Sequence, residues 1–303
     1  MARRLELTVP PELDGARVGD LLRGELGLSG SAIGRIKRRA GAILLDGQSA
    51  HPGVRAAAGQ ALSVDVAEPE RPADIPPWPG PVEMVYEDED LLVVNKPAGL
   101  LCHPAPGQGG DTLAGRVMYE LERRGEEPGC HLVHRLDRGT SGLVIMARHP
   151  HAQERLKGLL HTSAFTRTYL AVCDGVPSPA AGVVEAPIGR APHSILARQV
   201  DPAGQAARTR YRVLGEREGR ALVELVLDTG RTHQIRVHMA HLGCPLTGDW
   251  LYGTEDRAVI PRPALHAWEI ALTHPITGEA RRWRAPLPGD MAALVGAEIR
   301  KRL

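Results

Sequence analysis

At the centre of this 303-residue chain lies the stretch His134-Arg135-Leu136-Asp137-Arg138-Gly139-Thr140-Ser141-Gly142. It places a single acid, Asp137, between two arginines in a turn rich in Gly, Ser and Thr, which is typical of an exposed loop. An apolar run, Leu143 to Ala147, follows directly and predicts a buried strand. Because nearby arginines favour the charged form of an aspartate, the loop should present a carboxylate in a positive setting. Taken alone, the string also fits an ordinary surface Arg–Asp pair.

The composition sets broad limits on the class of protein. The formal net charge is +1, 43% of the residues are hydrophobic, and only 3% are aromatic. The length is sufficient for two domains. The four cysteines are widely separated with no C-x-x-C, which favours free thiols in a reducing compartment. With no secretory segment and no membrane-length apolar run, we expect a soluble cytoplasmic protein that has no membrane partner.

A second polar motif follows the alternating residues 223–227. It reads Thr229-Gly230-Arg231-Thr232-His233-Gln234-Ile235-Arg236-Val237-His238. Ile235, Met239 and Leu242 recur at helical spacing and Gly243 is a natural C-cap, so a strand should pass into a helix here. Arg231 stands at that junction, where a side chain can point into a cleft.

Two further stretches carry polar or aromatic groups beside predicted strands. The residues Asn95-Lys96-Pro97-Ala98-Gly99 form a sharp turn after the apolar strand 91–94, and His103-Pro104 follows it. Residues 165–172 have the composition of a strand and include Arg167-Thr168-Tyr169. In isolation, Tyr169 is most simply a core tyrosine at a strand end.

Together, and in this order, these motifs resemble the RluA-type pseudouridine synthases. The resemblance covers the chain from Val82 onward. It implies that Asp137 is the catalytic aspartate, that Tyr169 stacks on the target base, and that Arg231 pairs with Asp137. It also implies that Ile235 packs near the flipped base. Stacking of a base on an aromatic ring contributes about 1–3 kcal/mol without requiring a particular base.

The same resemblance suggests residues that contact RNA. Arg135 would fill the space that a flipped uridine vacates, with Arg138 beside it. The N-K-P-x-G and H-P stretches would place Lys96 and His103 next to the cleft. Lys96 would contact a phosphate or brace the catalytic loop, and a plain turn with one exposed lysine explains it nearly as well.

Residues 1–66 are expected to form a small separate domain. Val18, Leu21, Leu22 and Leu26 mark one helix, and a second should run from Ser31 to Ala40. This second helix carries the basic residues Arg35, Lys37, Arg38 and Arg39. The order of two helices and a hairpin resembles the S-four RNA-binding fold, although a basic helix face can also be merely solvated. Residues 67–81 are rich in proline and predict a linker to a catalytic domain at 82–303.

The implied fold is mixed α/β (α+β), a largely antiparallel central sheet with the cleft across its middle. The implied reaction is the isomerisation of specific uridines in structured RNA, large-subunit ribosomal RNA first and transfer RNA second, by a monomer. We expect no cofactor and no metal, since the His spacings at 131–134 and 233–241 match no recognised zinc pattern. Whether Asp137 is a nucleophile or a base is left open. The alternatives are a non-catalytic RNA-binding or ribosome-assembly protein, and a retaining glycosidase, which would need a second carboxylate.

Overall fold

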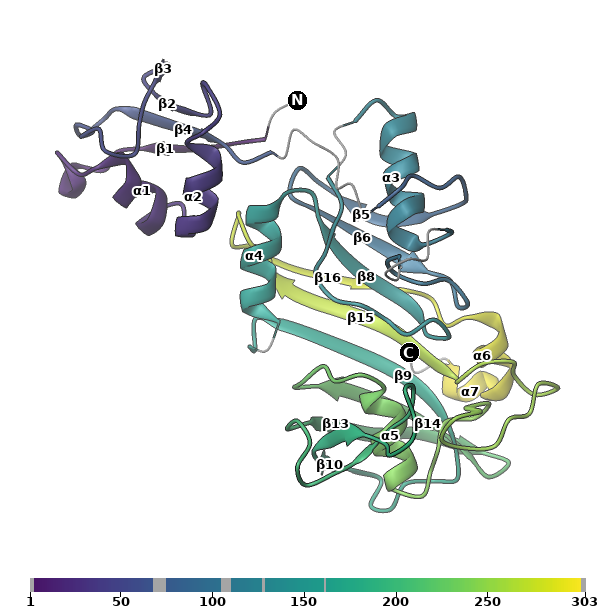
Figure 1. The fold of residues 1–303 in the computed structure, drawn as a ribbon. Coiled ribbons are helices and arrows are strands. Elements are labelled where there is room, and N and C mark those ends of the chain that lie inside the picture. The colour runs from purple at the N-terminus through teal and green to yellow at the C-terminus, as the bar shows by residue number, and fades with distance from the viewer. Residues whose placement is uncertain (1–2, 68–74, 105–109, 127–128, 161, 301–303) are drawn as a thin grey trace.

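The computed structural model describes residues 3–67, 75–104, 110–126, 129–160 and 162–300 (Figure 1). Residues 3–67, here called the N-terminal module, form a sheet of their own in the order β1-β4-β2-β3. The strands are β1 (Arg4–Thr8), β2 (Ile43–Leu45), β3 (Gln48–Ser49) and β4 (Ala61–Asp65). Helices α1 (Val18–Gly24) and α2 (Gly30–Ile36) pack on it through a separate apolar core, to which Leu21, Leu22, Ile33 and Leu62 belong.

The predicted basic helix is shorter than expected. Helix α2 ends at Ile36, so Lys37, Arg38 and Arg39 lie in the turn that follows it. Arg35, Lys37 and Arg38 are exposed, but Arg39 folds back into the module. Its guanidinium donates to the carbonyl oxygens of Asp65 and Ala67 and pairs with the Asp65 carboxylate at 3.4 Å. These contacts hold the module together, and an RNA contact by Arg39 stays a prediction.

The rest of the described chain is organised by one large sheet in the order β10-β13-β14-β9-β15-β8-β6-β5. The strands on this path are β5 (Glu83–Glu87), β6 (Leu91–Lys96), β8 (Ser141–Ala147), β9 (Phe165–Asp174), β10 (Ala181–Glu185), β13 (Arg208–Arg217), β14 (Arg220–Leu227) and β15 (Leu265–Thr273). Strands β7 (His131–Leu132) and β16 (Ala280–Arg284) pair with β8 and β15. Between neighbours on this path, only β15 and β8 run parallel. The predicted mixed α/β fold with a largely antiparallel sheet is confirmed.

Helices lie against this sheet (Figure 1). They are α3 (Leu113–Arg123), α4 (Pro150–Leu159), α5 (Gln234–His241), α6 (Gly289–Leu294) and α7 (Ala297–Arg300), while β11 (Ile188–Arg190) and β12 (Arg198–Val200) form a separate hairpin. Helix α3 begins where the Thr112 side chain accepts a hydrogen bond from the Gly115 amide, and its Leu113, Val117 and Leu121 enter the core. No helix formed by the described residues is long and apolar enough to cross a membrane.

The start of β8 fixes the position of the loop that contains Asp137. All seven residues of β8 are buried, as the apolar run predicts. Gly142 has φ of +111°, and a Cβ there would collide with the backbone of Ala267 on β15. Only glycine permits that close approach, so β15 can pair with β8 directly behind the loop. Residues 68–74, within the predicted linker 67–81, lie outside the described residues.

Candidate active site

A pocket of about 480 Å³ opens above the middle of the large sheet. Asp137 enters it from the loop between β7 and β8, and Tyr169 from β9. Arg231 and Ile235 come from the connection between β14 and α5 and from α5 itself. Residues from three separate parts of the sequence thus line one cavity. Their predicted roles in the reaction remain predictions.

The Asp137 loop is braced from below by Lys96. This side chain is completely buried, and its ammonium donates to the carbonyl oxygens of Pro97 at 2.9 Å, Leu100 at 2.8 Å and Arg138 at 3.3 Å. Burial lowers the pKa of Lys96 to about 8. Of the two roles expected for Lys96, contact with a phosphate or bracing of the catalytic loop, these contacts favour bracing, because the three donors hold the N-K-P-x-G turn against the loop.

A thiol provides a second brace that the sequence did not reveal. Cys102 is buried, and its Sγ accepts from the Leu136 amide at 3.3 Å and donates to the Leu136 carbonyl at 3.5 Å. The loop closes with a hydrogen bond from the Thr140 amide to the Asp137 carbonyl at 3.1 Å. The backbone on both sides of Asp137 is therefore fixed, while the Asp137 side chain remains 34% exposed to the pocket.

The cation nearest to the Asp137 carboxylate differs from the predicted one. Arg236 Nη1 and His233 Nε2 both lie 3.9 Å from Asp137 Oδ2. Arg231 lines the pocket, but it is exposed and its Nε donates to the carbonyl oxygen of Ala206 at 3.0 Å. The position at which α5 begins explains this difference. Arg231 precedes α5 in a turn, whereas Arg236 lies on the buried side of α5. The predicted pairing of Arg231 with Asp137 is corrected to Arg236.

Arg236 is held in place from behind. Its Nε and Nη2 bind the two carboxylate oxygens of Asp249 at 2.7 and 2.6 Å, and its guanidinium lies 4.9 Å from the centre of the Tyr252 ring. Burial alone would lower the pKa of Arg236, but the hydrogen bonds that it donates to Asp249, together with the negative charges of Asp249 and Asp137, outweigh burial and raise the pKa. A permanent positive charge therefore faces Asp137.

His233 lies beside the same carboxylate. It has φ of +58°, a conformation that few residues other than glycine adopt, and it directs the ring toward Asp137. Burial lowers the pKa of His233, which favours the neutral ring. Tyr252 accepts a hydrogen bond from the Arg198 amide, and its hydroxyl lies 2.8 Å from His233 Nδ1. The other ring nitrogen of His233, Nε2, faces Asp137.

The apolar wall of the pocket is formed by Tyr169 and Ile235, which are 5% and 4% exposed. Burial raises the pKa of Tyr169, so its ring is a neutral surface. Arg167 lies on the same face of β9 and is buried, and its Nε and Nη2 have no hydrogen-bond partner among the described residues. The pocket thus offers an apolar platform, a carboxylate and several hydrogen-bond donors within one cavity.

Three other predicted contact residues, Arg135, Arg138 and His103, also line the pocket. Arg135 is exposed and lines both this pocket and an adjoining one of about 560 Å³, as does His103. Arg138 is exposed and its Nε donates to the Gly99 carbonyl at 2.9 Å, which ties it to the Lys96 turn. Arg35, Lys37 and Arg38 belong to the N-terminal module and do not line the pocket.

Comparison with known proteins identifies the family. Residues 90–241 match the model of the RNA pseudouridylate synthase family. This span contains the Asp137 loop, the strand with Tyr169 and the start of α5. The chain belongs to the RNA pseudouridylate synthases. It is therefore an isomerase that acts on RNA, and the non-catalytic alternative and the glycosidase alternative are set aside.

Relatives of this RNA pseudouridylate synthase extend over most of its length. Ribosomal large subunit pseudouridine synthase D of Nitrosomonas europaea is 38% identical over 97% of this chain and 87% of its own. An uncharacterized RNA pseudouridine synthase of Bacillus subtilis, YhcT, is 42% identical over 78% of each chain. The solved structure of human RNA Pseudouridylate Synthase Domain Containing 4 is 27% identical, with a TM-score of 0.57, over 69% of this chain and 90% of its own.

Proposed function

We propose that this synthase converts uridine to pseudouridine in large-subunit ribosomal RNA, with Asp137 as the catalytic carboxylate. The proposal is supported by the relatives named for the large ribosomal subunit, which align over nearly the whole chain. The observation that carries the role of Asp137 is its position: a partly exposed carboxylate facing the buried Arg236 across a pocket walled by Tyr169 and Ile235.

The reaction conserves the atoms of the nucleoside. The bond from the ribose anomeric carbon to N1 of uracil breaks, the base turns, and the same carbon bonds to C5. C5 loses its proton and N1 gains one, so the product is an isomer of the substrate. Asp137 either attacks the anomeric carbon or removes a proton from the sugar. The uridine must first leave its stack, which costs a few kcal/mol and is easiest in loops and bulges.

Each pocket residue has a task in this scheme. Tyr169 and Ile235 hold the flipped base by stacking and apolar contact. Arg236 and His233 orient Asp137, and the cation of Arg236 is preorganised, so it does not have to reorganise during the reaction. Exposed Arg135 at the rim occupies the space that the base leaves in the RNA. These residues need only bind, orient and move one proton.

The N-terminal module is proposed to bind the RNA away from the target uridine. Arg35, Lys37 and Arg38 are exposed and have no acid among them in sequence, which suits contact with phosphates. Such contacts add affinity that does not depend on sequence and that falls with salt. We further propose that the synthase works as a monomer in the cytoplasm, where ribosomal RNA is assembled.

The proposed substrate can be tested by mapping pseudouridines with carbodiimide across total RNA from cells with and without this gene. The proposal predicts that specific reverse-transcription stops, which mark carbodiimide-labelled pseudouridines, are lost from large-subunit ribosomal RNA in cells without the gene. Purified protein should restore these stops on a transcript of that RNA. Loss of stops from transfer RNA alone would contradict the proposed substrate but not the family.

A further inference from the structure

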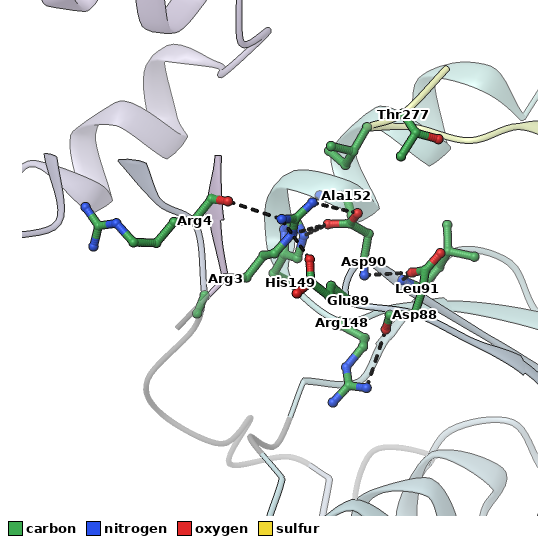
Figure 2. Close-up of polar contacts among 12 residues, drawn as sticks. Arg3, Arg4, Asp88, Glu89, Asp90, Leu91, Arg148, His149, Ala152 and Thr277 are labelled. Carbon is green, nitrogen blue, oxygen red and sulfur yellow. Dashed lines mark hydrogen bonds and ion pairs between the residues drawn. The ribbon is translucent and has the colours of Figure 1, made fainter. Parts of the chain in front are cut away.

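A mostly buried ion pair joins the N-terminal module to the part of the chain that contains the large sheet and the Asp137 pocket, here called the catalytic part (Figure 2). Arg3 Nε lies 2.8 Å from Asp90 Oδ1, and Nη2 lies 3.0 Å from Asp90 Oδ2, so the pair is bidentate. Arg3 Nη1 also pairs with Glu89 at 2.9 Å. The Arg3 and Asp90 side chains are 22% and 4% exposed. Two-pronged pairs of this kind fix orientation as well as distance.

Asp90 is anchored on the catalytic side before Arg3 reaches it. His149 Nδ1 accepts from the Ala152 amide at the start of α4, so Nε2 carries the proton and donates to Asp90 Oδ1 at 2.9 Å. The Arg148 amide donates to the Asp90 carbonyl at 2.9 Å. Burial alone would raise the pKa of Asp90, but the hydrogen bonds from His149 and Arg3 lower it. The carboxylate is therefore a rigid, charged acceptor for an arginine of the other part.

Two more contacts set how the module sits on α4. The Ser29 hydroxyl, at the start of α2, donates to Glu154 at 2.8 Å. Gly27 lies so close to Arg155 that a Cβ at Gly27 would collide with the Arg155 guanidinium. Ile276, from the turn after β15, packs against the core of the module. Contacts at several separate points restrict rotation of the module, not only its distance.

The same helix leads to the active site. Gln153 and Lys157 of α4 line the adjoining pocket, which shares Arg135 and His103 with the Asp137 pocket. One helix therefore contacts the module through Glu154 and Arg155 and borders the entrance of the catalytic pocket through its other residues. A structured RNA that covers α4 can reach both parts at once.

We propose that the Arg3–Asp90 pair is a latch that fixes the orientation of the N-terminal module, so that the enzyme selects RNAs whose phosphates reach the module while a uridine occupies the Asp137 pocket. This proposal rests on the proposed function. With the latch closed, a long RNA meets two surfaces that are already oriented. With it open, binding must also order the module, which weakens affinity for long RNA only.

The test compares two substrates. One is a long transcript of large-subunit ribosomal RNA, and the other is a short hairpin that contains only the target uridine of that transcript and its neighbours. The variant Arg3→Gln should raise KM for the transcript about tenfold and leave kcat, and the hairpin kinetics, within about twofold. Arg3→Lys keeps the positive charge but loses the second hydrogen bond to Asp90, so its KM for the transcript should lie between those of the wild type and Arg3→Gln. The matched control is Arg23→Gln, because Arg23 is an exposed arginine of the same module that pairs with Asp20 inside it at 3.0 Å.

Small-angle X-ray scattering provides a readout that needs no RNA. Arg3→Gln should increase the radius of gyration, whereas Arg23→Gln should not. The latch is overturned if Arg3→Gln scatters like the wild type, if it leaves KM for the transcript unchanged, or if it impairs hairpin and transcript equally. A wild-type enzyme that modifies neither RNA would instead contradict the proposed function, and the scattering result would still decide whether the latch exists.

Discussion

Arg236 places Nη1 3.9 Å from Asp137 Oδ2 while its Nε and Nη2 bind both oxygens of Asp249. The guanidinium is thus fixed by one carboxylate and directed at another. Asp249 is completely buried and Asp137 is partly exposed, so only Asp137 can meet a substrate. This arrangement makes Arg236, more than Arg231, the residue that positions the Asp137 carboxylate.

Replacement of Arg236 should therefore have a larger catalytic effect than replacement of Arg231. Arg236→Gln is expected to lower kcat about 10²–10³-fold, the range seen when one preorganised electrostatic contact is removed. Arg231→Gln should mainly raise KM, because its Nε is bound to a backbone carbonyl. Single-turnover rates, measured over a range of concentrations of a transcript that the wild type modifies, give the effects on kcat and on KM. Arg212→Gln, at an exposed arginine paired with Glu224, is the control, and equal losses at Arg231 and Arg236 would refute the assignment.

Removal of the anchor behind Arg236 should affect stability as well as rate. Asp249→Asn leaves a buried guanidinium without its charged partner, and breaking such a pair costs about 3–5 kcal/mol. Urea unfolding should show this loss as a lower midpoint with an unchanged slope. Asp111→Asn removes a carboxylate from a more exposed pair with Arg116 and should shift the midpoint far less. A midpoint for Asp249→Asn equal to that of Asp111→Asn would rule out the anchor role.

Lys96 should be required for the geometry of the catalytic loop and not for RNA affinity. Lys96→Met keeps the buried stem but leaves the carbonyls of Pro97, Leu100 and Arg138 without their donor, at about 1–3 kcal/mol for each unsatisfied group. We expect a lower kcat and lower stability, with the dissociation constant for RNA and its salt dependence unchanged. A flatter dependence of RNA affinity on salt in Lys96→Met would show that Lys96 contacts phosphate after all.

Stability should fall below about pH 6.5 because histidines are buried in the neutral form. Burial lowers the pKa of His134 to about 3 and that of His266 to about 4. Below pH 6.5 the unfolded chain binds protons that the folded protein excludes, so each of these histidines removes about 2 kcal/mol of stability by pH 5. Unfolding in urea at pH 7 and pH 5 measures this loss. His266→Gln should reduce the difference between the two pH values, and an unchanged difference would contradict the burial argument.

The sequence predicted the elements whose patterns are local. The apolar run 143–147 gave β8, and the helical spacing of Ile235, Met239 and Leu242 gave α5. These elements depend on neighbours in the chain, so periodicity and turn chemistry were sufficient to find them. The expectation that Asp137 and Tyr169 lie together came instead from the resemblance to the RluA-type pseudouridine synthases.

The features that the sequence could not provide depend on partners far along the chain. Nothing near Lys96 indicates that carbonyls up to Arg138 would surround its ammonium. The choice between Arg231 and Arg236 depends on where α5 begins and on Asp249, thirteen residues beyond Arg236. The pairing of Arg3 with Asp90 spans 87 positions and follows from how the module docks. A signal that could have favoured Arg236 is its place one residue after Ile235 on the same helix, but periodicity alone does not choose between them.

The central claim is that the Asp137 carboxylate isomerises uridine. The most direct measurement is single-turnover pseudouridine formation by purified Asp137→Asn on a transcript that the wild type modifies, together with its RNA dissociation constant. The account predicts no detectable product, with an affinity within about twofold of the wild type, because the substitution changes one charge and little shape. Product formation by Asp137→Asn at a rate near that of the wild type would contradict it.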